Sequence, residues 1–469
     1  MNLKIQDILN CTKGELIIGN KKMECKNYSK DTRTIKKGDT YIGIKGEKYD
    51  GSMFWKDALD NGADVVIINK INLEKKEIEK YNMQNKCIIQ VEDTITALAQ
   101  MASYKREMYK GKLKVVAVTG SVGKTSTKDI IANVISQKYK TLKTEGNNNN
   151  NIGLPLTILR LKDEEVAVIE IGMNHFGEIS YLTKIAKPDI AVITNIGTSH
   201  IGNLGSRENI LKAKLEILEG MENKLSIINN DNDLLNKWNL ENKEKIKIHT
   251  FGINEKSEFQ AENIELNENT SKFICNYKNE KINISVPVGG EHFILNALCA
   301  IAVGKLLGLN NEQIIKGIEN FKLTAKRMEI NYLKNNIIII NDSYNASYES
   351  MKASISILKN MNAKRRIAVL GDMFELGEFS EKLHRDVGIE INKNNIDKLF
   401  LIGENAKYIA EEAENQGYKK ENILYFNDKN LLLDTLKQNL QEGDVVLVKA
   451  SNGMKLFEVV ENLKKDLEK

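Results

Sequence analysis

The stretch VVAVTGSVGKTSTKDII (residues 115–131) decides the fold, because it passes from a buried strand through a glycine turn into a helix. Its first residues are apolar and β-branched, as in a strand covered on both faces. Gly120 and Gly123 let the backbone turn tightly and approach an anion. The N–H groups at a helix start carry the positive end of the helix dipole and favour phosphate. The stretch therefore predicts a nucleotide-binding phosphate loop in an α/β domain.

The residue types of this loop assign its parts. Lys124 is expected to reach the β- and γ-phosphates of ATP, and Thr125 to place its hydroxyl on Mg²⁺. The usual spacing G-x-x-x-x-G-K-[ST] would put its first glycine at Val118, so TGSVGKT is a shorter variant. A chance Gly-Lys-Thr turn is the alternative, but the strand before and the helix after disfavour it. The residues predicted to bind ATP here are Thr119, Gly120, Ser121, Val122, Gly123, Lys124, Thr125 and Ser126.

Patterns on either side divide the chain into three α/β domains, at 1–108, 109–322 and 323–469. The first is a small α/β domain, the second a central phosphate-loop domain with a doubly wound, mostly parallel sheet, and the third a Rossmann-like α/β domain. A polar, alternating segment at 255–285 predicts a small β insertion before the middle domain's last helix. Buried strands are predicted at 112–119, 165–171, 189–195, 336–342, 366–372, 398–403 and 444–450.

The composition is that of a globular protein, and it excludes several classes. Of 469 residues, 41% are hydrophobic and 28% charged, which is unlike a disordered chain. The net charge of +4 is spread along the chain, without the clustered basic patch of a nucleic-acid-binding protein. The N-terminus lacks a signal peptide's apolar core, and no stretch has the length of a membrane span. The five cysteines are scattered, so we expect a cytoplasmic protein with reduced thiols that serve in core packing.

Longer motifs extend beyond a generic phosphate loop. They occur in the order TGSVGKTSTKD, GNNNNNIGLPLTILRL, AVIEIGMNHFGEIS, PDIAVITNIGTSHIGNLGS, KAKLEI, GEHFILNALCAIAV, AKRMEI, NDSYNAS and LGDMFELGEFS. With the N-terminal DTR…GD…GIKGEKYDG and the C-terminal KASNGMK, they cover nearly the whole chain. In these motifs the chain resembles the Mur ligases of peptidoglycan synthesis.

The resemblance implies an ATP- and Mg²⁺-dependent amide ligase. In the branch that LGDMFELGEFS suggests, ATP phosphorylates the terminal carboxylate of UDP-N-acetylmuramoyl-tripeptide, and the amine of D-alanyl-D-alanine attacks the acyl phosphate. The first domain would hold the UDP part, the middle one ATP, and the last would help to bind the incoming amine. The resemblance also implies a monomer.

The resemblance also implies catalytic and nucleotide-binding residues. Lys124, Glu170, His200 and Lys214 would be catalytic, and Thr125, Glu170, His200 and Lys214 would serve the metal sites. Glu170 closes an apolar strand, where a carboxylate is hard to explain as core. Lys214 matches a lysine that is carbamoylated in the family, with Lys212 as a nearby competitor. Asn296 would meet the adenine, and Arg327, Asp342 and Tyr344 the nucleotide across the domain gap.

The five asparagines at 147–151 fit the family pattern G-N-x-N-N-x-I-G-x-P without a gap, so they are expected to form a substrate loop and not a linker. Asn offers both a donor and an acceptor and tolerates left-handed backbone. The residues predicted to bind the substrates are Asp31, Thr32, Arg33, Lys45, Asn147, Asn149, Asn150, Asn174, His175, Asp372 and Glu375.

Three other interpretations remain open. A Mur ligase that adds the third residue usually carries a DNPR-type motif, which is missing here, and a folylpolyglutamate synthetase usually lacks such a first domain. A phosphate-loop NTPase without ligase activity would hydrolyse ATP or GTP with no amide product. The chain departs from the family at Asn345-Ala346-Ser347, where Asn-Ala-Asn-Pro is frequent, and at Asn452, where Arg is frequent. These departures affect the recognition of the amine and not the ligase class.

Overall fold

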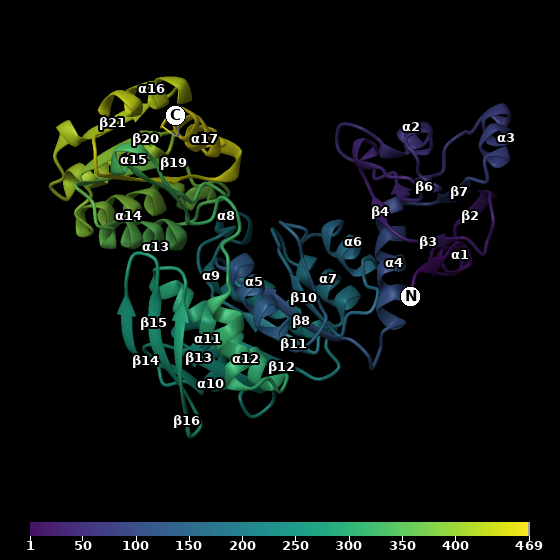
Figure 1. The fold of residues 1–469 in the computed structure, drawn as a ribbon, viewed down its shortest axis with the longest axis horizontal. Helices are drawn as coiled ribbons and strands as arrows, with labels where there is room; N and C mark the ends of the chain where they lie inside the picture. Colours follow the sequence, from purple (N-terminus) through teal and green to yellow (C-terminus); the bar gives the residue numbers. More distant parts are fainter. Residues whose placement is uncertain (468–469) are drawn as a thin grey trace.

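The structure, a computed structural model, describes residues 1–467, which form an elongated molecule (Figure 1). An N-terminal part, a middle part and a C-terminal part follow one another, each with its own sheet and covering helices. This confirms the predicted α/β class. The predicted strands are also present, each with ends within about two residues of those expected.

The N-terminal part packs short helices against a mixed sheet in the order β2-β7-β6-β5-β4. The pairs among β4 to β7 are parallel, and β2 is antiparallel to β7. Its elements are β1 Leu3–Lys4, α1 Ile5–Thr12, β2 Glu15–Ile18, β3 Glu24–Cys25, β4 Tyr28–Ser29, β5 Thr40–Ile42, α2 Trp55–Asp60, β6 Val65–Asn69, α3 Lys75–Met83, β7 Cys87–Val91 and α4 Thr94–Glu107.

Helix α4 joins this part to the middle part (Figure 1). Asp93 caps its start by accepting a hydrogen bond from Thr96 N at 2.7 Å. Near its end, the buried Arg106 donates to Ala186 O at 2.9 Å and to Lys187 O at 3.1 Å. These contacts tie the end of α4 to the middle part, beside the end of α7 (Glu178–Ala186).

The middle sheet has the order β16-β15-β14-β13-β12-β11-β8-β10-β9. It is parallel from β14 to β9, whereas β15 pairs antiparallel with β14 on one side and with β16 on the other. Its elements are β8 Lys114–Thr119, α5 Lys124–Ile135, β9 Thr141–Lys143, α6 Gly153–Leu159, β10 Val166–Glu170, α7, β11 Ile190–Ile193, α8 Ile201–Leu204, α9 Arg207–Leu215, β12 Leu225–Asn229, α10 Asp233–Asn242, β13 Lys247–Gly252, β14 Phe259–Leu266, β15 Ser271–Tyr277, β16 Glu280–Val286, α11 Glu291–Leu306 and α12 Asn311–Glu319.

The segment predicted as a small β insertion forms β14 to β16. It is not a separate unit, because β14 pairs with β13 and so extends the large sheet. Two helices, α11 and α12, follow it, where one was expected. Strands β8, β10 and β11 lie inside the sheet, each between two neighbouring strands, and are buried almost throughout, as expected of parallel strands covered on both faces.

The C-terminal sheet has the order β17-β18-β22-β19-β20-β21 and is parallel except for β17. This confirms the second doubly wound α/β unit. Its elements are β17 Glu329–Tyr332, β18 Ile338–Asn341, α13 Tyr348–Asn360, β19 Arg365–Gly371, α14 Ser380–Lys393, β20 Lys398–Ile402, α15 Ala406–Asn415, β21 Ile423–Phe426, α16 Lys429–Asn439, β22 Asp444–Lys449 and α17 Phe457–Leu467.

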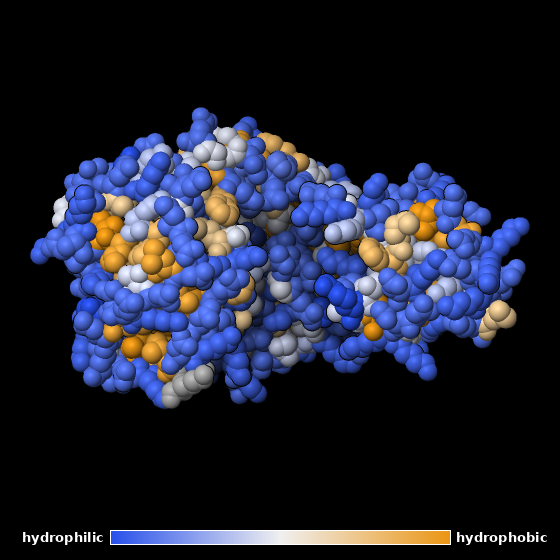
Figure 2. Space-filling view, turned by 90° about the horizontal axis from the view of Figure 1, so that it is seen from above, coloured by the Kyte–Doolittle hydropathy of each residue, from blue (hydrophilic) through white to orange (hydrophobic). Residues whose placement is uncertain are grey.

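The middle and C-terminal parts touch at several places. The β14–β15 turn reaches the C-terminal part, where Asn269 hydrogen-bonds to Tyr332 and Glu268 accepts from Asn362 N. Glu349 of α13 accepts hydrogen bonds from Thr198 N and Oγ1, at 2.7 and 3.1 Å. The face seen in Figure 2 is mostly hydrophilic and is hollowed between the larger body and the N-terminal part. Within residues 1–467, no helix combines the length and apolar character needed to cross a membrane.

Two glycines in the packing of α11 and α12 against α5 give a stability prediction. A Cβ at Gly317 would lie 2.4 Å from Val134 Cα, whereas one at Gly304 would meet only side-chain atoms of Ile314 and Val134, at 3.1 Å. The α5 backbone at Val134 cannot shift aside as easily as the ends of flexible side chains can. We therefore expect Gly317→Ala to lower the free energy of unfolding by about 1–3 kcal/mol.

Gly304→Ala is the matched control, because its modest overpacking is offset by a gain in helix propensity of up to about 1 kcal/mol. Urea unfolding of the two variants followed by circular dichroism checks this. Equal losses of stability in the two variants would mean that the close approach to the Val134 backbone does not determine the cost of Gly317→Ala.

Candidate active site

A cavity of about 510 Å³ lies between the middle and C-terminal parts. Its walls include residues that follow the carboxyl ends of β8, β10 and β11 on one side and of β18 on the other. Ligands of doubly wound sheets bind at this edge. Of the predicted site residues, it gathers Ser121, Val122, Gly123, Lys124, Thr125, Ser126, Asn147, Asn149, Glu170, Asn174, His200, Asn296, Arg327, Asp342 and Tyr344.

The phosphate loop is braced from the neighbouring strand. Asn195, which follows β11, accepts with Oδ1 from the N–H groups of Ser121 and Val122, at 3.1 and 2.9 Å. Thr194 Oγ1 donates to Val122 O at 2.7 Å. Gly120 has φ +151°, and a Cβ there would lie 1.9 Å from Thr194 Oγ1, so only glycine fits. The turn is thus fixed before α5 begins at Lys124, and the N–H groups of that first turn have no partner within the helix.

Lys124 folds back over the loop that precedes it. Its Nζ donates to Gly120 O at 2.8 Å and to Ser121 O at 3.2 Å. Burial lowers its pKa, the Glu170 carboxylate opposes that shift, and Arg327 adds to it. The ammonium therefore sits where an incoming anion would be stabilised by a cation that water screens little.

Glu170 is held by three groups from different parts of the middle domain. Its Oε2 accepts from Thr125 Oγ1 at 2.9 Å, and its Oε1 accepts from Asn149 Nδ2 at 2.8 Å. Its own N–H donates to Thr144 Oγ1 at 3.0 Å. This 2%-exposed carboxylate faces the cavity lining and not solvent, which argues against a solvated strand end.

The asparagines of the run at 147–151 make different contacts. Asn149 orients Glu170, and Asn150 caps α6 by accepting from Ile152 N at 3.2 Å and Gly153 N at 2.9 Å. Asn147 is exposed and lines the cavity. A Cβ at Gly153 would lie 2.4 Å from Asn148 Cα, so the loop packs closely on the helix it precedes. The run is therefore an ordered loop beside the site, and not a linker.

The two lysines of KAKLEI lie in opposite environments. Lys214 is 1% exposed, and Lys212 is exposed. Burial lowers the pKa of Lys214 well below its usual value, and the nearby Lys124 ammonium lowers it further. Lys214 does not itself line the cavity, but its coupling to Lys124 places it beside the phosphate loop.

One end of the cavity offers an unpartnered amide. Asn296, on α11, accepts with Oδ1 from Thr127 Oγ1 of α5 at 2.9 Å. Its Nδ2 is buried and has no hydrogen-bond partner among the described residues. Phe251 and Phe293 line the same cavity. A flat heterocycle with an acceptor atom, such as adenine, would satisfy the amide.

Arg327 and Tyr344 reach the cavity from the C-terminal side. The Arg327 guanidinium lies 4.0 Å from the centroid of the Tyr344 ring. Its Nε is buried and has no partner among residues 1–467. Asp342, by contrast, is fully engaged by Met328 N, Ser354 Oγ and Lys449 Nζ. A bond from Asp342 to a ribose hydroxyl remains a prediction, and would compete with these donors.

His200 pairs with Glu375 across the interface. His200 has φ +64° at the start of α8, and its Nδ1 lies 2.5 Å from Glu375 Oε2. This close contact with His200 holds the pKa of the Glu375 carboxyl below its usual range. Gly202 N also donates to Glu375 O at 3.1 Å. A predicted metal-site residue and a predicted amine-binding residue are thus in contact with each other.

The other predicted substrate residues are spread out. Asp372 is buried and caps α15, its Oδ1 accepting from Asn405 N and Ala406 N. Asn174 and His175 are exposed, with their N–H groups on Glu178. Asp31, Thr32, Arg33 and Lys45 lie in the N-terminal part and do not line the cavity.

In that N-terminal group, Arg33 contacts Asp31 with two hydrogen bonds, at 2.7 and 2.9 Å. These bonds lower the pKa of Asp31 to about 2. The Arg33 side chain is 86% exposed and Lys45 is exposed, so both cations are accessible to a ligand. Thr32 offers its carbonyl to Asn61 Nδ2.

The cavity lining also includes residues that were not predicted, among them Asn195, Glu349, Lys449 and His292. Asn195 and Lys449 each follow or end an apolar strand, the same signal that identified Glu170. Glu349 lies in a helix with no such mark. Burial lowers the pKa of His292 to about 4, so its imidazole is neutral near pH 7.

These observations test whether the residues fit ATP and Mg²⁺. The orphaned Asn296 Nδ2 and Arg327 Nε, with the free first turn of α5, suit a nucleotide's base and phosphates. The 2.9 Å between Thr125 Oγ1 and Glu170 Oε2 equals the separation of about 2.9 Å between adjacent ligands of an octahedral Mg²⁺. Within residues 1–467, no three His, Cys, Asp or Glu side chains converge on a metal site, so phosphate or water would complete the shell. The residues fit both groups.

Comparisons with known proteins agree with this geometry. The chain matches the Mur ligase family, catalytic domain, over residues 24–106, the Mur ligase middle domain over 118–304, and the Mur ligase, glutamate ligase domain, over 326–452. These matches together span most of the chain.

Curated relatives match most of the length of the chain. The UDP-N-acetylmuramoyl-tripeptide–D-alanyl-D-alanine ligase of Bacillus subtilis is 38% identical over 437 residues, covering 92% of each chain. The protein of the same name from Escherichia coli is 33% identical over 442 residues, covering 93% of each.

Solved structures are similar throughout. A MurF structure from Acinetobacter baumannii superposes with a TM-score of 0.88 at 30% identity, covering 99% of both chains. The MurF ligase of Thermotoga maritima in complex with ADP gives 0.79 at 29% identity, covering 94% of this chain and 98% of that one. Sequence, fold and site geometry agree, and the chain belongs to the Mur ligase family.

Proposed function

We propose that the chain is an ATP-dependent amide ligase that adds D-alanyl-D-alanine to UDP-N-acetylmuramoyl-tripeptide in the synthesis of peptidoglycan precursors. One observation carries the proposal. The Lys124, Thr125 and Glu170 cradle opens into a cavity whose far wall is supplied by the C-terminal part. ATP phosphates can therefore meet a second reactant between two domains. The names and lengths of the relatives support this choice of substrates.

The chemistry explains why such a site needs cations. A carboxylate is a poor electrophile, so one of its oxygens first attacks the γ-phosphorus of ATP and the bond to ADP breaks. The amine of D-alanyl-D-alanine then attacks the acyl carbon, phosphate leaves, and the nitrogen loses a proton. The protein must bring two anions together and hold them in line.

Each residue's role follows from its position. Lys124, released from Gly120 O and Ser121 O, would bind the phosphates, and Arg327 would approach them from the other domain. Thr125 and Glu170 would hold Mg²⁺, with His200 and Lys214 at a second metal position. Bound Mg²⁺ would neutralise charge on the transferring phosphoryl group. Asn296 would read the adenine, with Asp342 and Tyr344 on the nucleotide's other side.

The substrate residues divide into contacting and positioning groups. We propose that Asp31, Thr32, Arg33 and Lys45 bind the UDP part, and that Asn147, Asn174 and His175 meet the peptide-bearing sugar. Asn149, Asn150 and Asp372 would act through the elements they hold, which are Glu170, α6 and α15. Glu375 would attract the dipeptide's ammonium once His200 turns to a metal.

The three predicted domains take the three parts of the reaction. Residues 1–108 would bind the UDP-sugar, 109–322 ATP, and 323–469 the amine. We further propose that the enzyme acts in the cytoplasm as a monomer, without a nucleic-acid partner and without insertion into a membrane.

Release of phosphate from ATP tests the reaction directly. We expect release only when UDP-N-acetylmuramoyl-tripeptide and D-alanyl-D-alanine are both present. Lys124→Ala should lower kcat by about 100-fold or more, because the lost cation stabilises charge that develops in the transition state.

Lys110→Ala is the matched control, since Lys110 makes an exposed ion pair with Glu222 in the same domain, and it should leave the rate unchanged. Release that needs neither substrate would contradict the ligase function and favour a phosphate-loop NTPase.

The buried Lys214 gives a second test. A carbamate forms when a neutral amine adds CO₂ and releases a proton, and the lowered pKa keeps Lys214 neutral at a pH where an exposed lysine is charged. With ¹³C-labelled bicarbonate, we expect one carbamate resonance in the wild-type NMR spectrum. Lys214→Met should remove this resonance and most of the activity.

Lys212→Met, two residues away and exposed, should retain both the resonance and the activity. A resonance that persists in Lys214→Met and disappears in Lys212→Met would assign the carbamate to Lys212.

A further inference from the structure

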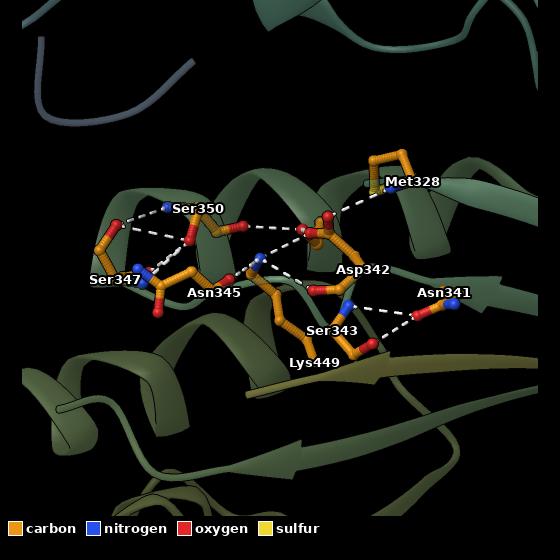
Figure 3. A network of polar contacts seen from close by, with 9 residues as sticks. Met328, Asn341, Asp342, Ser343, Asn345, Ser347, Ser350 and Lys449 are labelled. Atoms are coloured by element: carbon orange, nitrogen blue, oxygen red, sulfur yellow. Dashed lines mark hydrogen bonds and ion pairs between the residues drawn. The ribbon is translucent and has the colours of Figure 1, made fainter. Parts of the chain in front are cut away.

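A buried ion pair lies at the nucleotide cavity, and its lysine, Lys449, has no role in the steps above. Lys449 is the last residue of β22, and Asp342 directly follows the adjacent strand β18 (Figure 3). Lys449 Nζ lies 2.6 Å from Asp342 Oδ2, 3.0 Å from Asn345 O and 3.4 Å from Asp342 O. The two side chains are 3% and 12% exposed. Three acceptors use the three N–H groups of the ammonium, so none is left for a ligand.

Asp342 passes this restraint to the segment between the middle and C-terminal parts. Its Oδ1 accepts from Met328 N at 3.1 Å (Figure 3). Ser354 Oγ donates to its Oδ2 at 2.6 Å. Tyr344 N also donates to Lys326 O at 3.1 Å. Both residues that flank Arg327 are thus fixed to the loop that follows β18.

The backbone at these flanking residues needs such a restraint. Lys326 has φ +64° and Met328 φ +51°, and neither is glycine. Side-chain-bearing residues rarely adopt this left-handed region, because Cβ approaches the carbonyl oxygen. Without its hydrogen bonds, the segment would relax toward ordinary backbone angles and carry Arg327 with it.

The backbone at Lys326 and Met328 sets the direction of the Arg327 side chain. Its guanidinium lies over the Tyr344 ring at 4.0 Å, and its buried Nε has no partner among the described residues. Lys124 and Arg327 line the same cavity, one from the middle part and the other from the C-terminal side. Such a cation pair is unfavourable until an anion separates it.

We propose that Lys449 is a positioning residue for nucleotide binding: through Asp342 it holds the left-handed backbone around Arg327 and so aims the guanidinium at the phosphates. This inference rests on the proposed ATP-binding function. If Lys449 is lost, the buried Asp342 carboxylate loses its cation and either takes up a proton or turns toward water. In both cases the hydrogen bond from Met328 N to Asp342 weakens, and the Arg327 side chain is no longer oriented before the nucleotide binds.

Calorimetric titration with ADP in the presence of Mg²⁺ tests this on the full-length protein. We expect Lys449→Met and Arg327→Met each to weaken ADP binding by about 10-fold, the effect of losing one charge-assisted contact. The double variant should bind no more weakly than Arg327→Met alone, because Lys449 acts through Arg327. Independent effects that multiply in the double variant would overturn the proposal and give Lys449 a separate role.

Arg365→Met is a matched control for stability. Arg365 pairs with the fully buried Asp444 at the other end of β22, so this variant breaks a buried ion pair on the same strand away from the cavity. It should lower the melting temperature as Lys449→Met does, yet leave the Kd for ADP unchanged. Equal losses of ADP affinity in the two variants would mean that Lys449 only stabilises the fold.

Ser354→Ala is a second test of the same restraint on Asp342, for the case that Lys449→Met does not fold. It removes one donor to the same Asp342 oxygen, and should weaken ADP binding by about 2- to 10-fold in the wild type but not in the Arg327→Met background. Unchanged affinity in the wild-type background would overturn the proposal. A wild-type protein that does not bind ADP would overturn the proposed function and this inference together, whereas normal wild-type binding with independent variant effects would overturn the inference alone.

Discussion

The hydrogen bond between Thr125 Oγ1 and Glu170 Oε2 joins the start of α5 to the end of β10, and the rest of the site is arranged around it. It forms because β8 and β10 are parallel neighbours, with Val118 opposite Glu170, so their carboxyl ends meet at one edge. Asn149 fixes the second carboxylate oxygen, which brings the asparagine loop to the same point. The phosphate loop, the oxygens proposed to hold Mg²⁺ and the asparagine loop are therefore positioned by one pair of strands.

The middle part builds only half of the cavity. Arg327, Tyr344, Asp342 and Lys449 come from the C-terminal side, and Glu349 and Glu375 fix that side to the loop that contains Thr198 and His200. The loop at 197–199 also touches the phosphate loop, since Gly197 N donates to Ser121 Oγ. Movement of the C-terminal part is thus coupled to the phosphate loop by contiguous hydrogen bonds. Such coupling suits a reaction whose two reactants sit on different domains.

Local patterns were sufficient for much of the fold and for the centre of the site. Apolar runs predicted the central strands, and a carboxylate at the end of a strand predicted Glu170, because burial and strand ends leave a signal in a few neighbouring residues. Residues whose roles depend on distant partners left no such signal. Lys449 acts through Asp342, more than 100 residues earlier, and Glu349 faces Thr198 across a domain boundary. Likewise, Lys214 is buried and Lys212 is exposed, but the two lysines have similar neighbours in the sequence, so sequence alone did not distinguish them.

The proposed reaction depends on transfer of the γ-phosphoryl group of ATP to the carboxylate that is to be activated. The most direct measurement uses UDP-N-acetylmuramoyl-tripeptide with ¹⁸O in both oxygens of its terminal carboxylate, followed by mass spectrometry of the products. An acyl phosphate requires one labelled oxygen to leave with the inorganic phosphate while the other stays in the new amide. Unlabelled phosphate, or label in AMP, would contradict the account, because the carboxylate oxygen would then not have attacked the γ-phosphorus.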